Sequence, residues 1–244
     1  MQKVYELYYW PTIQGRGEFV RLALEYANVD YVDVARQPEE EGGGVSALIR
    51  FLENKDMQNP QFASPFLKID EFIIGQTANI LQYLGIRHAL APDNEDDRLW
   101  IHQLQLTIAD FVVEIHDTHH PIAGELYYED QKEEAQRRAE NFRENRLPKY
   151  LCYFERVLAN NSRGNRYLVG NTLSYADLSL FQLVAGLRYA FPNTMIRIEG
   201  EYPLLIALHD HIETLPRIGA YLPSGRRIPF NQRGIFRYYK ELDL

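Results

Sequence analysis

The spacing of apolar positions in the first 84 residues predicts short strands that alternate with helices. The run VYELYY is β-branched and aromatic with partial alternation, and Trp10-Pro11 ends it because proline cannot continue a strand ladder. Helical spacing then begins at Gly17 and stops at Asn28. In the order β-α-β-α-β-β-α, we expect strands at 4–9, 31–34, 66–69 and 72–75 and helices at 17–28, 45–52 and 76–84.

The second half of the chain carries apolar positions at helical spacing only. A long stripe runs over 101–115, and a second runs over 139–158 on a surface rich in charged residues. Pro148 should kink or divide the second helix, because proline removes a backbone hydrogen bond. A third helix is expected to begin at Ser174 and a fourth to follow Pro203.

Between these two patterns, the segment GIRHALAPDNEDD mixes glycine, proline, acids and amides with little periodicity. Such composition is typical of a domain boundary. We therefore expect an α/β domain at 1–86, a linker at 87–95 and an all-helical domain at 96–244.

Composition narrows the classes of partner. The chain has 26 basic and 34 acidic residues, a net charge of −8, which is unfavourable for binding nucleic acid. No apolar run approaches the roughly 18 residues that would cross a membrane, and the start has neither a basic nor a hydrophobic leader region. We expect a cytoplasmic protein. Its single cysteine, Cys152, excludes an internal disulfide and a CxxC pair, so any reactive sulfur should come from a ligand.

The most specific local motif is LVGNTLSYADLSLF at 168–181. Ser174 and Asp177 have the spacing of a capping box, with Leu173 and Leu178 as its hydrophobic staple. This pattern indicates a structural device that starts a helix, and its loss should cost on the order of 1 kcal/mol or more.

This motif resembles the capping segment in the helical domain of cytosolic glutathione transferases. Three further stretches agree: LYYWP with the GRGE that follows it, Ser64-Pro65 with Gln76-Thr77 eleven residues later, and Ile-Ala-Asp at 108–110. The resemblance covers nearly the whole chain apart from the tail after about 222. It implies a thioredoxin-like α/β N-terminal domain and an all-α C-terminal domain.

The resemblance also implies an activity. The chain would be a tyrosine-type transferase and a homodimer, with glutathione as co-substrate and no metal. A cysteine thiol with a pKa near 8.5 is only about 3 per cent thiolate at pH 7, so the site must favour the thiolate. A neutral phenol that donates a hydrogen bond to sulfur does so, and the family places this group where Tyr9 stands. Tyr8, which should face the other side of the sheet, is the alternative.

One departure from the family lies beside this tyrosine. The family has one residue fewer between the aromatic-proline triplet and the Gly-Arg pair, so Thr12-Ile13-Gln14 lengthens the turn. Arg16, after the turn, would either position the thiolate or brace the turn.

The other glutathione contacts follow from the resemblance. A cis Ser64-Pro65 bond would present the Ser64 backbone to the ligand as an added strand does. Gln76 and Thr77 open a helix whose free N–H groups favour the γ-glutamyl carboxylate. Asp110, on an apolar stripe, needs a partner, which is either the ligand's ammonium in the other protomer or an intrachain cation.

An apolar pocket between the domains would take the electrophile, with Trp10, Phe111 and Tyr189 as candidate walls. The tail at 224–239, rich in arginine and aromatic residues, has two alternatives: it wraps the helical domain or it closes the pocket.

Two other motifs and two rival functions are weaker alternatives to this interpretation. His116 and His120 have the i, i+4 spacing of a zinc pair, with His119 beside them, but no third ligand is fixed, and a polar face at the site entrance is favoured. The run GRGEFV imitates a dinucleotide-binding turn but lacks its third glycine. A glutathione-dependent isomerase or peroxidase, and a non-catalytic binding protein on the same scaffold, remain as rival functions.

Overall fold

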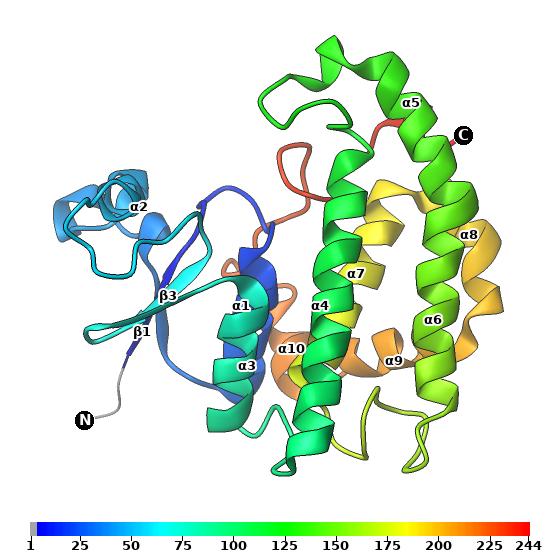
Figure 1. The fold of residues 1–244 in the computed structure, drawn as a ribbon, viewed down its shortest axis with the longest axis horizontal. Helices are drawn as coiled ribbons and strands as arrows, with labels where there is room; N and C mark the ends of the chain where they lie inside the picture. Colours follow the sequence, from blue (N-terminus) through cyan, green and yellow to red (C-terminus); the bar gives the residue numbers. More distant parts are fainter. Residues whose placement is uncertain (1–3) are drawn as a thin grey trace.

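The computed structural model describes residues 4–244, and its N-terminal part is built on a four-stranded mixed sheet (Figure 1). The strands lie in the order β2-β1-β3-β4, and β1 pairs parallel with β2 and antiparallel with β3. The sheet strands are β1 (Tyr5–Tyr8), β2 (Tyr31–Asp33), β3 (Phe66–Ile69) and β4 (Phe72–Gly75), with α1 (Gly17–Ala27), α2 (Gly44–Leu52) and α3 (Thr77–Arg87) packed around them.

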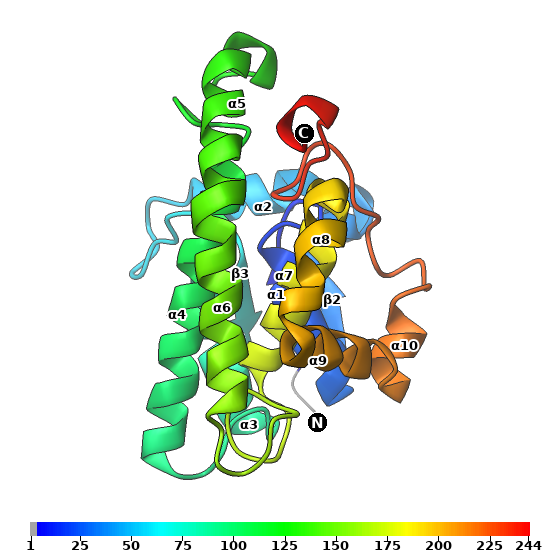
Figure 2. The same ribbon diagram turned by 90° about the vertical axis from the view of Figure 1, so that its right-hand side faces the viewer.

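The rest of the described chain consists of helices and the loops that join them, without a strand. Figure 2 shows α5 and α6 as one continuous column with α4 beside it on one side, and α8, α9 and α10 on the other. These helices are α4 (Glu95–Asp117), α5 (Lys132–Asn141), α6 (Leu147–Ala159), α7 (Tyr175–Ala190), α8 (Pro192–Ile198), α9 (Pro203–Glu213) and α10 (Pro216–Tyr221). Together with the sheet, they confirm the predicted fold class.

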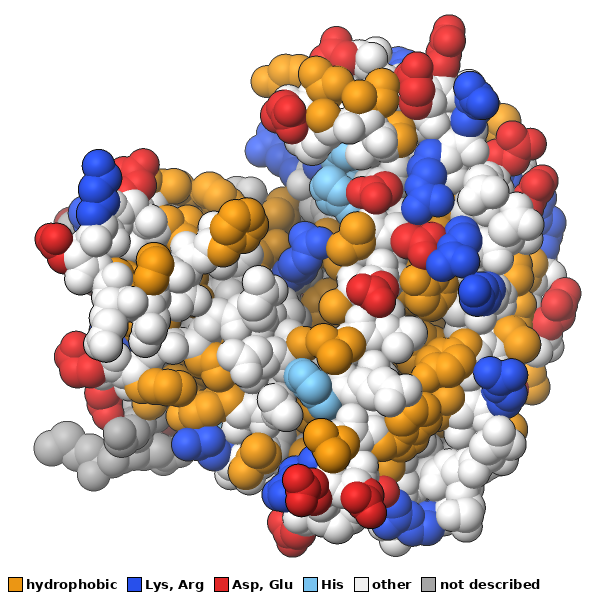
Figure 3. Space-filling model, in the orientation of Figure 1, with side chains coloured by type: hydrophobic (Ala, Val, Ile, Leu, Met, Phe, Trp, Pro, Cys, Tyr) orange, Lys and Arg blue, Asp and Glu red, His pale blue; other side chains and the backbone are white. Residues whose placement is uncertain are grey.

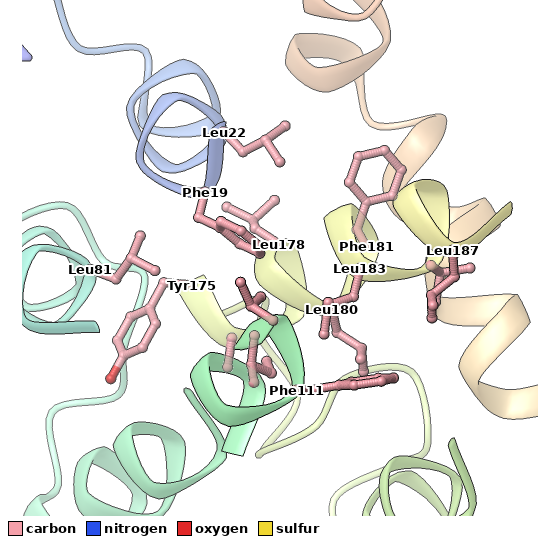
Figure 4. Close-up of a cluster of buried hydrophobic side chains, with 14 of the residues drawn as sticks. Phe19, Leu22, Leu81, Phe111, Tyr175, Leu178, Leu180, Phe181, Leu183 and Leu187 are labelled. Carbon is pink, nitrogen blue, oxygen red and sulfur yellow. The ribbon is translucent and has the colours of Figure 1, made fainter. Parts of the chain in front are cut away.

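Helix α7 lies at the centre of the hydrophobic core. Thirteen of its residues are buried, and it contacts α1, α4 and α9 (Figure 4). In the close-up, Leu81 of α3 lies beside Tyr175 of α7 and Phe19 of α1 lies beside Leu178. Phe111 of α4 lies near Leu180 of the same helix α7. The same core cluster contains residues of β1 and β3, so the core crosses the predicted linker. A smaller cluster, built from Tyr8, Val34, Ala47, Leu48 and Phe66, lies beneath α2.

The start of α7 has the predicted capping box. The carboxylate of Asp177 accepts the N–H groups of Ser174 and Leu168, both at 2.7 Å, and the Ser174 hydroxyl at 2.6 Å. Asp177 has no exposed surface, and its burial raises the pKa of the carboxyl to about 6. The box therefore fixes the preceding loop as well as the helix.

Several boundaries differ from the sequence prediction. The helix predicted at 76–84 begins at Thr77 and continues to Arg87, one residue into the predicted linker. The helix predicted over 139–158 is divided next to Pro148, as expected: α5 ends at Asn141, a π-helical turn spans Phe142–Arg146, and Pro148 stands in the first turn of α6. Helices α8 and α10 were not predicted. Among residues 4–244, no helix is both long and apolar enough to cross a membrane.

Candidate functional site

Three of the predicted site residues meet along one edge of the sheet. Tyr8 pairs with Phe66, and Phe66 pairs with Gly75. Extending both registers by one residue places Tyr9 opposite Pro65 and Pro65 opposite Gln76. The Ser64–Pro65 bond is cis, as the resemblance implied. The end of β1, the start of β3 and the end of β4 therefore form one row at the edge of the sheet.

Tyr9 is buried beneath the turn that follows β1. Its side chain is 5% exposed, and its phenol oxygen accepts the N–H of Arg16 at 2.9 Å. Any side chain at Gly15 or Gly17 would clash with the Tyr9 ring, so the two glycines allow the turn to close over it. Burial raises the pKa of Tyr9, and the N–H groups and charges of the turn oppose that rise only in part. Tyr9 is thus a neutral phenol at pH 7.

Tyr8 points to the other face of the sheet. It stacks on Phe66 with ring centroids 4.7 Å apart, and its hydroxyl donates to the carboxylate of Glu6 at 2.9 Å. Burial first, and then Glu6, raise the pKa of Tyr8. Its proton is already held by an acceptor on its own strand.

Charged residues lie buried below the glycine turn. The guanidinium of Arg21 contacts Asp33 at 2.7 Å and Glu18 at 3.4 Å, and the hydroxyl of Tyr221 donates to Glu18 at 3.0 Å. Glu18 and Arg21 have no exposed surface. Because buried charges are costly unless paired, this set fixes α1 relative to β2 and α10.

The start of α3 opens onto a cavity of about 310 Å³. Arg16, Gln76 and Thr77 line it from the N-terminal part, and His102 and Gln105 line it from α4. Three of the lining residues carry a buried polar atom without a hydrogen-bond partner among the described residues, namely Thr77 Oγ1, His102 Nδ1 and Gln105 Oε1. Unpartnered buried polar atoms are unfavourable, so the cavity suits a polar ligand.

His102 and Gln105 were not predicted from the sequence. Gln105 is 1% exposed and stands between Leu104 and Ile108 on the buried face of α4. A glutamine on an apolar stripe was the available signal. The sequence alone does not show that this glutamine lines a cavity, because α3 forms the opposite wall.

The prediction that Asp110 lies among buried apolar residues is wrong. The residue is on α4, but its side chain is exposed to solvent, so no burial penalty requires a partner. Exposed apolar residues share its helix, with Leu106 48% and Val113 46% exposed.

The prediction of Phe111 as a pocket wall is also wrong. Phe111 has no exposed surface and stacks on Tyr150, with ring centroids 4.1 Å apart, inside the helical core. Trp10 is 39% exposed beside the turn. Tyr189 is half-buried and stacks on Phe230 of the tail at 5.0 Å.

A larger cavity of about 700 Å³ lies where the tail meets the helices and the first turn. Thr12 lines it from the turn after β1, Tyr127 and Tyr128 line it from the α4–α5 connection, and Arg233 and Arg237 line it from the tail. The tail thus covers the helical part and also borders a cavity next to the turn. In the space-filling view, the surface is hollowed between the N-terminal part and the upper helices (Figure 3).

The three clustered histidines pack against one another at the end of α4. Their ring centroids are 4.8 to 5.1 Å apart, and His119 Nε2 bonds the carbonyl of Ile235 at 2.8 Å. Burial lowers the pKa of all three. Within residues 4–244, only one group of three potential metal-binding side chains has its ligand atoms within 4.8 Å of one another, namely His209, Asp210 and Glu213. A guanidinium nitrogen of Arg188 already contacts His209 there.

Comparisons with known proteins agree with this geometry. The profile of a family described as "Glutathione S-transferase, C-terminal domain" matches residues 116–225. The glutathione S-transferase of Plasmodium falciparum is 26% identical over 223 residues, covering 89% of this chain and 94% of the relative. Glutathione S-transferase P 1 of Xenopus laevis is 28% identical over 240 residues, covering 97% and 99%. Over almost its whole length, the chain is therefore similar to glutathione transferases.

A solved structure extends this likeness to the fold. The structure titled prostaglandin synthase D of Nilaparvata lugens matches with a TM-score of 0.70 at 24% identity, covering 93% of this chain and all of that one. The chain therefore shares the arrangement of sheet and helices of that structure along almost its entire length.

Proposed function

We propose that this chain conjugates the thiolate of glutathione to electrophilic, mostly apolar small molecules. The observation that carries the proposal is the state of Tyr9. Its oxygen is held by the Arg16 N–H at the sheet edge, and no acceptor for its proton is present among residues 4–244. A neutral phenol with an uncommitted proton is the donor that a thiolate needs.

The energetic requirement on Tyr9 is modest. Lowering the pKa of a thiol by two units requires about 2.7 kcal/mol and raises the thiolate from about 3 per cent to roughly three quarters at pH 7. A hydrogen bond from a neutral group to a charged one contributes about 1.5 to 3 kcal/mol. Tyr9 can therefore supply most of the activation, and Arg16 would add to it.

The peptide of glutathione would lie along the row at the sheet edge. We assign the cysteinyl backbone to Ser64 and Pro65, because Ser64 precedes β3 and its backbone is not part of the ladder. The γ-glutamyl end would enter the 310 Å³ cavity, with its carboxylate at Gln76 and Thr77. The unpartnered oxygen of Gln105 is an acceptor for the ammonium group.

A second copy of the chain would complete this end of the site. The exposed apolar residues of α4 lie seven residues apart, at Leu99, Leu106 and Val113, and so form one stripe. Figure 3 shows apolar side chains gathered over α4 and the neighbouring groove toward α6. We propose that a homodimer covers this stripe and that Asp110 of the partner subunit reaches the ligand's ammonium.

The electrophile would approach from the side of the tail. The 700 Å³ cavity and the exposed face of Trp10 suit an aromatic or aliphatic group, with Tyr189 behind the tail. In this assignment residues 1–86 hold glutathione, 96–244 shape the second pocket and 87–95 join them. We place the activity in the cytoplasm, as detoxification.

The proposal is tested by two assays on the same preparation: conjugation of glutathione to an activated chloronitrobenzene, and retention on immobilised glutathione. We expect both retention and turnover. Retention without turnover would favour the non-catalytic binding protein, and the absence of both would overturn the assignment. Turnover of an isomerisable or peroxide substrate in place of the aromatic one would favour the glutathione-dependent isomerase or peroxidase.

A further inference from the structure

The lengthened turn after β1 and the tail after about 222 lie against each other. Asn231 of the tail donates to the carbonyl of Thr12 at 2.9 Å. The amide nitrogen of Gln14 donates to the carbonyl of Ile228 at 2.5 Å. The tail therefore contacts the added length of the turn at two positions.

Gln14 is the most firmly held residue of the turn. It is 4% exposed, and its amide oxygen accepts from the Gln182 amide at 2.7 Å. Arg227 in turn donates to the amide oxygen of Gln182 at 3.1 Å. The side chain of Gln14 thus joins the turn to α7 and, both directly and through Gln182, to the tail.

The backbone of Gln14 is held as well. Its carbonyl accepts the N–H of Glu18 at 3.0 Å and a guanidinium N–H of Arg21 at 3.4 Å. With both its amide and its carbonyl engaged, Gln14 has little freedom to move relative to α1. Gln14 therefore anchors the turn to α1.

The next two residues touch the phenol. Gly15 follows Gln14 with a φ of +45°, and a β-carbon there would clash with the Tyr9 hydroxyl. Arg16 donates its N–H to that hydroxyl. A shift of Gln14 would consequently move the donor that orients the phenol, although Gln14 itself makes no hydrogen bond to Tyr9.

We propose that Gln14 is a positioning residue for thiol activation, and that residues 226–231 of the tail act through it to hold the lengthened turn over Tyr9. This inference rests on the proposed function. It concerns the orientation of the Tyr9 phenol, which the Arg16 N–H holds. The longer turn by itself would leave this N–H less well fixed. The tail restores that constraint from a point more than two hundred residues away in the chain.

The test compares Gln14→Met with a matched control, Gln131→Met. Methionine keeps the length of glutamine and removes its amide, and Gln131 is also fully buried and multiply hydrogen-bonded, but beside the α4–α5 connection. Thermal melting shows how far each variant is destabilised. The readout is the pKa of the thiol of bound glutathione, followed by ultraviolet absorbance of the thiolate against pH in the full-length protein.

For Gln14→Met we expect that pKa to rise by about one unit, with glutathione affinity within about threefold of wild type. The value of kcat/KM for conjugation should fall about tenfold at the acidic end of the pH profile, and the deficit should shrink as the thiol ionises at alkaline pH. Gln131→Met should lose stability without moving the thiol pKa.

An unchanged thiol pKa in folded Gln14→Met, or an equal shift in Gln131→Met, would overturn the inference. If Gln14→Met does not fold, Gln182→Met, which removes one of the two partners of the Gln14 amide, must give a smaller shift in the same direction. A wild-type protein that shows no thiolate absorbance with glutathione would instead contradict the proposed function, so the two failures are distinguishable.

Discussion

The chemistry of the site depends on which way two adjacent tyrosines point. Consecutive residues of a strand face opposite sides of the sheet, so Tyr8 and Tyr9 cannot share an environment. The Tyr8 hydroxyl donates its proton to Glu6, and its ring packs on aromatic neighbours. The Tyr9 oxygen accepts the N–H of Arg16, and the Tyr9 proton remains available for a ligand. The structure thus supports Tyr9 although the turn beside it is longer than the family's.

Replacing Tyr9 tests that assignment. We expect Tyr9→Phe to lower kcat for conjugation at neutral pH by at least about tenfold, or about 1.4 kcal/mol of transition-state stabilisation, while the affinity for glutathione stays nearly unchanged. The matched change, Tyr8→Phe, should leave kcat within about twofold. Steady-state kinetics of both variants decide between the tyrosines, because the opposite pattern would assign the role to Tyr8.

At the scale of elements, the capping box of α7 holds the preceding loop in addition to starting the helix. The carboxylate of Asp177 holds the N–H of Leu168 in addition to that of Ser174. Asp177→Ala would leave the Ser174 hydroxyl and two buried N–H donors without their acceptor, and each unpaired N–H costs about 1 to 3 kcal/mol. Ser174→Ala removes a hydroxyl and leaves the carboxylate bonds in place.

We therefore expect Asp177→Ala to lower the free energy of unfolding by about 2 to 5 kcal/mol and Ser174→Ala to lower it by about 1 kcal/mol. Denaturant unfolding measures both. Equal losses for the two variants would mean that the carboxylate serves the helix start alone.

The junction of α4 with the tail predicts a pH dependence. Burial lowers the pKa of His119 to about 2, so the folded protein keeps this imidazole neutral while the unfolded chain protonates it near pH 6.5. The unfolded state therefore binds more protons between these values, and the contribution of His119 to stability falls as the pH drops below about 6.5.

The variant His119→Gln should make this visible. The difference in the free energy of unfolding between wild type and variant should narrow by about 1.4 kcal/mol per pH unit below about pH 6. Denaturant unfolding at several values between pH 5 and pH 7.5 provides the measurement, and a difference independent of pH would show that His119 is protonated in the folded state.

Predictability from the sequence also differed among elements. The strands follow from short runs of β-branched and aromatic residues, and a long helix such as α4 follows from an apolar face that repeats at helical spacing. Helices α8 and α10 span seven and six residues, too short for a stripe to repeat, and each begins at a proline, which the sequence equally associates with turns. Phe111 was misplaced because periodicity tells which face is buried but not whether a cavity or a core faces it.

At the scale of the whole molecule, the site is assembled from distant segments. Gln105 acquires a role only because α3 lies across from α4, and Gln14 only because the tail returns to the first turn. Such contacts have no local pattern, so the sequence indicated the row at the sheet edge but not these two glutamines. The exposed stripe on α4 predicts a further contact, between copies of the chain.

Changing that stripe tests the homodimer. We expect Leu106→Asp to convert a dimer into a monomer in sedimentation experiments and to raise KM for glutathione several-fold, because Asp110 of the partner subunit is then lost from the site. The control is Ile196→Asp, at a residue of α8 that is 78% exposed, which should remain dimeric. A wild-type protein that sediments as a monomer, with glutathione bound normally, would contradict the shared site.

The central claim is that the Tyr9 phenol lowers the pKa of the glutathione thiol. The most direct measurement is a pH titration of thiolate absorbance for glutathione bound to the wild-type protein and to Tyr9→Phe. The account predicts a midpoint one to two units below the value of about 8.5 for a free thiol in the wild type, and a midpoint near the free value in Tyr9→Phe. Equal midpoints for the two proteins would contradict it.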